Sequence, residues 1–180
     1  MLHRVPLAAA VALATLAATP AKADELFVGV AAHGVDTPFT FDTGEGGADI
    51  QLGYRADRVE ALSFLGRPEP YVFGSVNTDG DTNFVAAGLS WTLGDGPVYV
   101  RPGIGLAVHD APSRRVDPAT GIRTDLGSRV LFEPEIAIGY RASDRLSLEA
   151  SWVHISNARI FNSEQNPGID AIGVRVNLAL

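Results

Sequence analysis

The chain of 180 residues is acidic, with 21 Asp and Glu against 14 Lys and Arg, and it contains no cysteine. A protein without cysteine is not one of the small secreted scaffolds that disulfides hold together. The acidic balance argues against nucleic acid as a partner, because binding to a phosphate backbone requires a basic surface.

The first 23 residues have the pattern of a secretory signal peptide. Arg4 gives a positive start, the apolar run that follows is too short to span a bilayer as a helix, and Ala-Lys-Ala at 21–23 is a small-x-small cleavage signal. We therefore expect a signal peptide over residues 1–23 and a single domain over residues 24–180. This domain keeps all 21 acidic side chains but loses Arg4 and Lys22, which leaves 12 basic side chains and a net charge of −9.

The remaining sequence has the pattern of a β-sheet protein. Segments of about ten residues alternate between apolar and small or polar side chains, and clusters of Gly, Pro, Asp and Asn separate them. No stretch offers the roughly 20 consecutive apolar residues of a membrane-spanning helix. The expected strands cover residues 25–33, 48–56, 59–76, 83–93, 98–109, 129–141, 145–156 and 169–180. Pro68 and Pro70 interrupt the third strand, which predicts a bulge or an edge-like break there.

The connections between these strands alternate in length. Short turns are expected at 53–58, 94–97 and 139–145, whereas the connections at 34–47, 77–82, 110–128 and 157–168 are mostly longer. Short turns at one end and loops at the other are typical of an outer-membrane barrel, with periplasmic turns and extracellular loops. A closed barrel has no free strand edge, so a monomer is the default expectation and the oligomeric state stays open.

The composition of the two strand faces indicates which face lines the barrel. Along the last strands one face is apolar, and the other carries small and charged side chains. The charged side chains are Arg101, Arg141, Arg175, Glu133, Glu135 and Glu149. Arginines that can pair with glutamates suit the crowded lumen of a small barrel, whereas a solvated exterior ordinarily carries Lys and Thr. We therefore predict an all-β fold, an eight-stranded antiparallel transmembrane β-barrel of the outer membrane, over a soluble barrel with an apolar interior.

Three polar side chains interrupt the apolar face of the last two strands. His154 and Ser156 follow Trp152 at the end of the seventh strand, and Asp170 lies at the start of the eighth. In an up-and-down barrel these strand ends meet on the extracellular side. The three side chains are the parts of a hydrolase triad, with a nucleophile, a general base and an acid that orients the imidazole. Alternatively, they lie just above the hydrocarbon, where polar side chains are harmless, and Trp152 marks the aromatic girdle.

The stretch SWVHISNARIFNSEQNPGID, residues 151–170, resembles the C-terminal motif of the outer-membrane lipid A 3-O-deacylases, the PagL family. That motif is a His-x-Ser-Asn run followed by an Asn-x-Gly-hydrophobic-acid run, found here at 154–157 and 166–170. The resemblance implies an eight-stranded barrel with a catalytic triad of His154, Ser156 and Asp170 on its lipid-facing exterior. The family's acid is usually Glu, one methylene longer than Asp170, and Asp has the same role in other triads.

The resemblance also implies a function. The chain would be a serine esterase of the outer membrane that hydrolyses the ester-linked acyl chain at the 3-position of lipid A in lipopolysaccharide, without metal or cofactor. Asn166 becomes the candidate donor of an oxyanion hole, and Asn157 either shares that role or braces the strand end. An outer-membrane phospholipase and a non-catalytic barrel are the alternatives.

Two loops carry weaker signals. The segment NTDGDTN at 77–83 resembles a calcium loop in composition, but it lacks the twelve-residue spacing and final Glu, so a hairpin turn is expected. Arg114, Arg115 and Arg123 either contact lipid A phosphates or are solvated. Glu164 is the next candidate if Asp170 is not the acid of the triad.

Overall fold

The computed structural model of the chain describes residues 24–40, 43–112, 116, 119, 121, 123–160 and 165–180. The signal peptide expected over residues 1–23 lies outside the described residues, as do Arg114, Arg115 and Glu164. Within the described ranges the regular elements are eight strands and one 3₁₀ helix. No helix in this part of the chain is long and apolar enough to cross a membrane.

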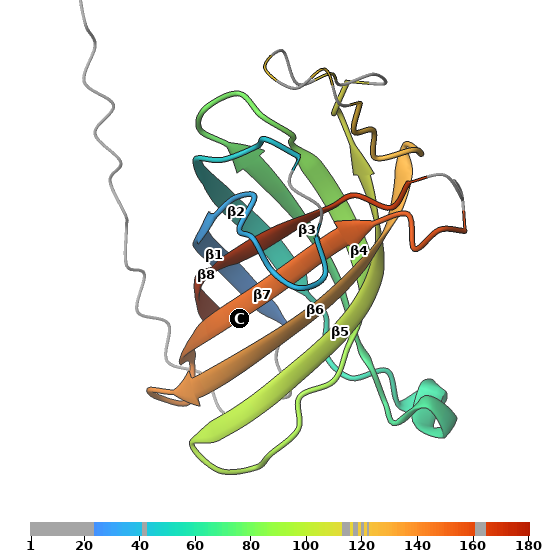
Figure 1. The fold of residues 1–180 in the computed structure, drawn as a ribbon. Coiled ribbons are helices and arrows are strands. Elements are labelled where there is room, and N and C mark those ends of the chain that lie inside the picture. The colour runs from blue at the N-terminus through green and yellow to red at the C-terminus, as the bar shows by residue number, and fades with distance from the viewer. Residues whose placement is uncertain are drawn as a thin grey trace, which may run out of the picture.

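Eight antiparallel strands close into one barrel, in which each strand pairs with its neighbours in the chain (Figure 1). The strands are β1 (Glu25–Ala32), β2 (Ala48–Arg55), β3 (Glu69–Asn77), β4 (Phe84–Ser90), β5 (Val98–His109), β6 (Val130–Arg141), β7 (Leu146–Ser156) and β8 (Gly168–Ala179). The barrel closes between β1 and β8, whose register pairs Glu25 with Ala179 and Ala32 with Ile172. The predicted eight-stranded antiparallel barrel is therefore confirmed.

The two ends of the barrel carry different connections. The loop end carries the β1–β2, β3–β4, β5–β6 and β7–β8 connections, and the terminal end carries the start of β1, the end of β8 and the other three connections. At the loop end the Asn77 side-chain oxygen accepts the backbone N–H groups of Asp79 and Asp81. The segment at 77–83 is therefore the turn between β3 and β4.

The connection between β2 and β3 differs from the prediction. The sequence predicts a strand over 59–76, but β3 begins at Glu69, and the 3₁₀ helix η1 (Glu60–Leu65) occupies the earlier part. Gly66 ends η1 in the left-handed region at φ 82°, where glycine meets no steric penalty. Pro68 has no backbone N–H to donate to a strand ladder, so regular pairing begins only after it. The short turn expected after β2 is therefore a long connection.

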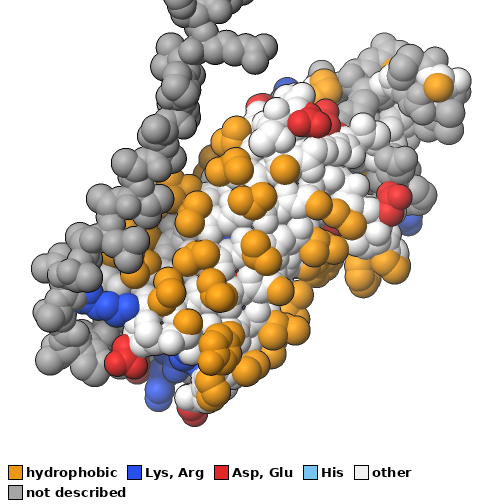
Figure 2. Space-filling view, turned by 90° about the vertical axis from the view of Figure 1, so that its left-hand side faces the viewer, with side chains coloured by type: hydrophobic (Ala, Val, Ile, Leu, Met, Phe, Trp, Pro, Cys, Tyr) orange, Lys and Arg blue, Asp and Glu red, His pale blue; other side chains and the backbone are white. Residues whose placement is uncertain are grey.

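Side chains alternate between the exterior and the lumen along the strands. On β6, Ile138 is 61% exposed and its neighbour Ala137 is 3% exposed. Figure 2 shows the outcome on one face, where hydrophobic side chains cover the wall and charged side chains lie towards its ends. The prediction that the apolar face points outward and the charged face lines the lumen is confirmed.

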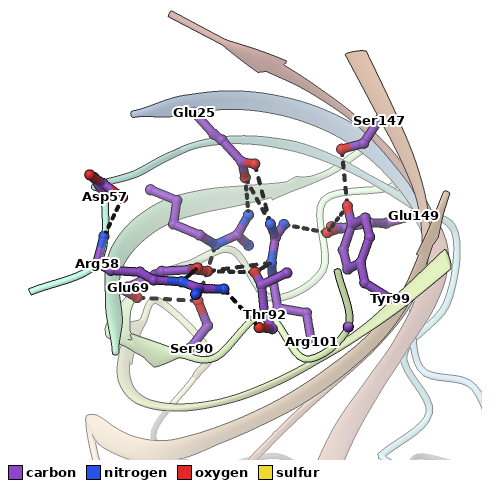
Figure 3. Close-up of polar contacts among 12 residues, drawn as sticks. Glu25, Asp57, Arg58, Glu69, Ser90, Thr92, Tyr99, Arg101, Ser147 and Glu149 are labelled. Carbon is purple, nitrogen blue, oxygen red and sulfur yellow. Dashed lines mark hydrogen bonds and ion pairs between the residues drawn. The ribbon is translucent and has the colours of Figure 1, made fainter. Parts of the chain in front are cut away.

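Arginine and glutamate side chains neutralise each other inside the barrel (Figure 3). Arg101 pairs with Glu149 and with Glu25, and Arg175 pairs with Glu135 at 2.7 Å. The paired residues come from different strands, so each pair links parts of the wall through the lumen. Such pairing is necessary because a buried charge without a partner is strongly destabilising.

Arg141 does not pair as the sequence predicts. Its guanidinium carbon lies 4.5 Å from the centroid of the Tyr99 ring, and its N–H groups donate to backbone carbonyls of the β4–β5 connection. As the last residue of β6, Arg141 lies at the terminal end, where these carbonyls are closer than the glutamates deeper in the lumen. Glu133, another predicted partner, accepts a hydrogen bond from the Tyr71 hydroxyl.

Glycines make room for the aromatic rings that fill the lumen. A Cβ atom at Gly139 would overlap the Tyr99 ring, and one at Gly53 would overlap Phe27 and Phe73. The predicted combination of small residues and opposite charges therefore reflects a lumen with little free space.

Candidate active site

The ends of β7 and β8 bring the predicted polar residues together on the exterior wall. His154 is the cross-strand partner of Asp170, and Ser156 is the partner of Gly168 two positions further along. All four have the outward parity of Ile172, yet all four are buried. The site is therefore on the apolar face that the sequence predicts, but other parts of the chain cover it.

His154 and Asp170 form a buried pair. The Nδ1 atom of His154 lies 2.7 Å from Oδ1 of Asp170, and the Asp170 residue is 1% exposed. A carboxylate that accepts the Nδ1 proton fixes the tautomer of the ring and leaves Nε2 with a free lone pair. The pair can therefore act as a general base whose second nitrogen is directed away from the acid.

The imidazole extends from the acid towards the cross-strand pair formed by Ser156 and Gly168. A Cβ atom at Gly168 would overlap Cε1 of His154 and would lie 3.1 Å from Nε2. Ser156 pairs with Gly168 of β8 on one side and with Phe132 of β6 on the other. Within this described part of β7, no hydrogen bond joins the Ser156 hydroxyl to His154. Catalytic hydrogen bonds are often long before substrate binds, so this geometry is compatible with a nucleophile and its base.

Two more donors bind the Asp170 carboxylate. The indole N–H of Trp152 donates to Oδ1 at 3.0 Å, and the Thr37 hydroxyl donates to Oδ2. Thr37 precedes Asp170 by 133 residues and belongs to the β1–β2 connection, drawn in blue in Figure 1. The sequence gives no signal for this contact, because nothing in the local pattern around Thr37 indicates which strand end it covers.

Aromatic rings cover the pair on one side. The Phe39 and Trp152 rings lie 5.7 Å apart, and the Trp152 and His154 rings are stacked with centroids 5.9 Å apart. Trp152 therefore does more than the membrane-girdle role suggested by its sequence position, because it touches both members of the pair.

Asn157 is a brace at the end of β7. Its side-chain N–H₂ group donates to the Leu126 carbonyl at 3.1 Å and to the Gln165 carbonyl at 3.0 Å. Its side-chain oxygen accepts the Arg159 N–H at 2.6 Å. Both amide protons are thus used to join the β5–β6 and β7–β8 connections, which agrees with the bracing alternative.

Asn166 has a different environment. Its side-chain oxygen is buried and has no hydrogen-bond partner within the described parts of the chain. A buried amide oxygen without a partner is unusual in a folded protein. Within the described residues, its side-chain oxygen therefore keeps an accepting capacity that the resting fold does not use.

A second buried cluster lies at the loop end, just beyond β1. The His33 ring contacts Glu45 through Nε2 at 2.7 Å and Asp49 through Nδ1 at 3.0 Å. Burial by itself lowers the pKa of His33, but the hydrogen bonds and charges of Asp49 and Glu45 raise it to about 9, so the ring is cationic at neutral pH.

Arg123 is the one described residue among the three arginines that the sequence suggests as phosphate contacts. Arg123, expected either to contact phosphates or to be solvated, is exposed and pairs with Asp125. In the described part of the chain, no group of three or more His, Cys, Asp or Glu side chains is arranged to hold a metal ion.

Comparison with solved structures shows the same fold in outer-membrane proteins. The barrel is similar to the outer membrane enzyme PagL, with 18% identity, a TM-score of 0.61 and coverage of 87% of this chain and 99% of that chain. It is also similar to the N-terminal β-barrel domain of Pseudomonas aeruginosa OprF, with 11% identity, a TM-score of 0.53 and coverage of 87% and 98%. Neisserial surface protein A matches with 10% identity, a TM-score of 0.50 and coverage of 87% and 97%.

The match to a protein family is more specific than these likenesses of fold. No curated protein matches the chain. The model of the lipid A 3-O-deacylase (PagL) family matches residues 48–179, which include β2 to β8 and the strand ends that carry His154, Ser156 and Asp170. The chain therefore belongs to the PagL family of lipid A 3-O-deacylases.

Proposed function

We propose that this protein is a serine esterase of the outer membrane that removes the ester-linked acyl chain at the 3-position of lipid A, with Ser156, His154 and Asp170 as its catalytic triad. The observation that carries the proposal is the hydrogen bond between His154 and Asp170 on the exterior wall, next to Ser156. The trio occupies outward-facing positions of the wall, where polar side chains are destabilising unless other parts of the chain cover them, as they do here, and a purely structural barrel has no need of this arrangement. Its presence is understandable if the substrate is itself a lipid.

In the acylation half of the reaction, the Ser156 hydroxyl oxygen attacks the ester carbonyl carbon and its proton passes to Nε2 of His154. Asp170 stabilises the resulting imidazolium through Nδ1. The tetrahedral intermediate then collapses, and the 3-hydroxyl of the sugar leaves with the proton from His154. The acyl chain is now an ester of Ser156.

In the deacylation half, water takes the place of Ser156 as the group that His154 deprotonates. Water attacks the acyl-enzyme, and a free fatty acid leaves as Ser156 recovers its proton. Both tetrahedral intermediates need donors directed at the oxyanion. Asn166 is the proposed side-chain donor, through its N–H₂ group, because the family motif places it beside the triad and its side-chain oxygen is not tied to a partner within the described residues. Asn157 is assigned the supporting role, since its amide protons are already bound.

The membrane location follows from the outward-facing surface. Apolar side chains that would be destabilising in water cover the wall (Figure 2), as expected for a barrel in contact with acyl chains. The solved structure most relevant to this location is described as that of an outer membrane enzyme. Lipid A is a lipid of the outer leaflet, and the triad at the loop end would face it there. A monomer is sufficient for this arrangement, because the closed barrel has no free strand edge.

The decisive variant is Ser156→Ala. It should abolish release of fatty acid from lipid A, because without the nucleophile only substrate binding and the oxyanion donors remain. The change in unfolding free energy should stay well under the ~2 to 5 kcal/mol of a core truncation. Ser151→Ala is the matched control, since Ser151 lies on the same strand but faces the lumen and should leave activity unchanged. Full deacylation by folded Ser156→Ala protein would refute the mechanism.

The substrate is tested with purified protein in detergent. Incubation with lipopolysaccharide and, separately, with phospholipid, followed by mass spectrometry of the lipids, should show loss of one 3-linked acyl chain from lipid A only. Products from phospholipid alone would indicate a phospholipase, and no product from either lipid would indicate a non-catalytic barrel.

A further inference from the structure

The acid of the proposed triad is held by residues outside the triad. Asp170 accepts three hydrogen bonds: Oδ1 accepts from His154 Nδ1 and Trp152 Nε1, and Oδ2 accepts from the Thr37 hydroxyl. A carboxylate with donors on both oxygens cannot rotate about its Cβ–Cγ bond without breaking at least one of these bonds. The direction in which it presents Oδ1 to the imidazole is therefore fixed from both sides.

The Thr37 hydroxyl is itself fixed as a donor. Its oxygen accepts the backbone N–H of Phe39 at 3.1 Å, so its single proton is free to point at Asp170. The turn that holds it is closed by Thr40, whose hydroxyl accepts the Thr37 N–H at 3.1 Å. Pro38 restricts the backbone between them, as proline does at the second position of a β-turn.

The barrel closure brings this turn to the active site. β1 pairs with β8 up to Ala32 and Ile172, and the Val35 N–H donates to the Asp170 carbonyl at 3.0 Å beyond the end of the strand. The backbone of the β1–β2 connection is thus bound to the same residue that its Thr37 side chain contacts. Thr37 lies before residue 48, where the match to the family model begins.

We infer that Thr37 and Trp152 are positioning residues that hold Asp170 in the orientation His154 requires, so that the β1–β2 connection is part of the active site. This inference rests on the proposed triad. Thr37 contacts the acid, and Trp152 contacts the acid through its N–H and the His154 ring through stacking. Loss of either donor lets the carboxylate turn away from Nδ1, and a misplaced general base slows catalysis because proton transfer depends on close alignment.

The test compares three threonine variants in the full-length protein. Thr37→Val removes the hydroxyl but keeps the shape, Thr37→Ser keeps the hydroxyl, and Thr78→Val makes the same chemical change in the β3–β4 connection, away from Asp170. Two quantities are measured: kcat and KM on lipid A, and the rate at which a fluorophosphonate labels the active-site serine.

Thr37→Val should lower kcat and the labelling rate by about 10- to 100-fold with little change in KM, as expected for misplaced catalytic groups. Thr37→Ser should restore most of both rates, and Thr78→Val should match the unmodified protein. Trp152→Phe, which keeps the ring beside Phe39 and His154 but removes the N–H, should also lower kcat.

The inference is overturned if Thr37→Val is as active as the unmodified protein, if Thr37→Ser is as impaired as Thr37→Val, or if Thr78→Val loses as much activity. These results would leave the proposed function standing so long as activity depends on Ser156. Activity that persists in Ser156→Ala would overturn the function and the inference together.

Discussion

The lumen and the exterior patch at the loop end both bury carboxylates, but the partners of these carboxylates differ. The exterior patch consists of Thr37, Trp152, His154, Ser156 and Asp170. In the lumen, Glu149 and Glu135 face the guanidinium groups of Arg101 and Arg175. In the exterior patch, Asp170 is held by an imidazole, an indole and a hydroxyl, and no arginine among the described residues pairs with it. Arginine cancels the carboxylate charge permanently, whereas neutral donors orient the carboxylate and leave its charge available.

This difference suggests a division of roles. A carboxylate that pairs with arginine in the resting protein contributes to stability and has little capacity to stabilise a transient cation. Asp170 keeps its negative charge for the imidazolium that forms when His154 accepts a proton. We therefore expect substitutions in the exterior patch to lower activity and leave the barrel folded, and substitutions in the lumen to lower stability and leave the folded protein active.

Asp170→Asn should give the largest effect. The amide keeps the shape of the carboxylate but loses the charge that stabilises the imidazolium, and it can force the wrong tautomer on His154, so activity should fall by roughly 10³-fold or more. The measurement is fatty acid release from lipid A, with folding checked by heat-modifiable mobility. Asp36→Asn, an exposed position in the same connection as Thr37, is the control. Equal activity in Asp170→Asn would remove it from the triad and make Glu164 the next candidate.

Gly168→Ala should have a smaller effect on activity. The added methyl group would overlap Cε1 of His154, so the ring must move away from Ser156 and Gly168. A displaced base should lower the rate by about 10- to 100-fold. Gly74→Ala is the matched control, because a Cβ atom there meets nothing within 4 Å. Equal rates for both variants and the unmodified protein would mean that the space beside Gly168 does not set the position of the ring.

Much of this comparison was predictable from the sequence, because it depends on alternation along strands. The two-residue period places Arg175 inside the barrel and Asp170 outside it on the same strand, and the order of neighbouring strands brings Asp170 next to His154. Both consequences follow from local pattern and from pairing between strands that are adjacent in the chain.

Features that depend on contacts distant in sequence were not predictable. The Thr37 contact exists only because β1 closes against β8, and its partner lies 133 residues away. The helix η1 was missed for a local reason. Pro68 interrupts strand pairing, but the sequence does not indicate whether the chain bulges within a strand or leaves the sheet, as it does in η1. For Arg141 the sequence predicted the lumenal face and the place at the end of the strand, but it did not indicate that backbone carbonyls of the β4–β5 connection would be the partners.

In the lumen, Glu149→Gln should lower stability without lowering activity. The substitution removes the charge that faces Arg101, although Arg101 keeps Glu25, so the loss should be about 2 kcal/mol, below the ~3 to 5 kcal/mol of a fully broken buried pair. Urea unfolding in detergent gives the stability, and lipid A deacylation gives the activity of the folded protein. Glu60→Gln breaks the exposed pair with Arg67, in which both side chains are 55% exposed, and should change stability by under ~1 kcal/mol. A loss of activity in folded Glu149→Gln protein would contradict the division of roles.

The smallest expected effect concerns His33, whose two carboxylate partners make it a third kind of buried cluster at the loop end. The folded state raises the pKa of His33 from its ordinary 6.5 to about 9 through Asp49 and Glu45, despite the opposing effect of burial. A raised pKa means that the cationic ring stabilises the fold fully below pH 6.5, and that this contribution is lost as the pH rises through about 9. The urea midpoint should therefore fall between pH 6.5 and 9 in the unmodified protein, and this fall should be reduced in His33→Gln, which has no proton to lose.

Deacylation activity provides the control for the His33 variant. Because His33 makes no contact with Asp170, the ratio of the deacylation rates of the two folded proteins should stay constant across the same pH range. Parallel stability curves for both proteins would show that folding does not raise the pKa of His33 and would contradict the stabilising role of its charge.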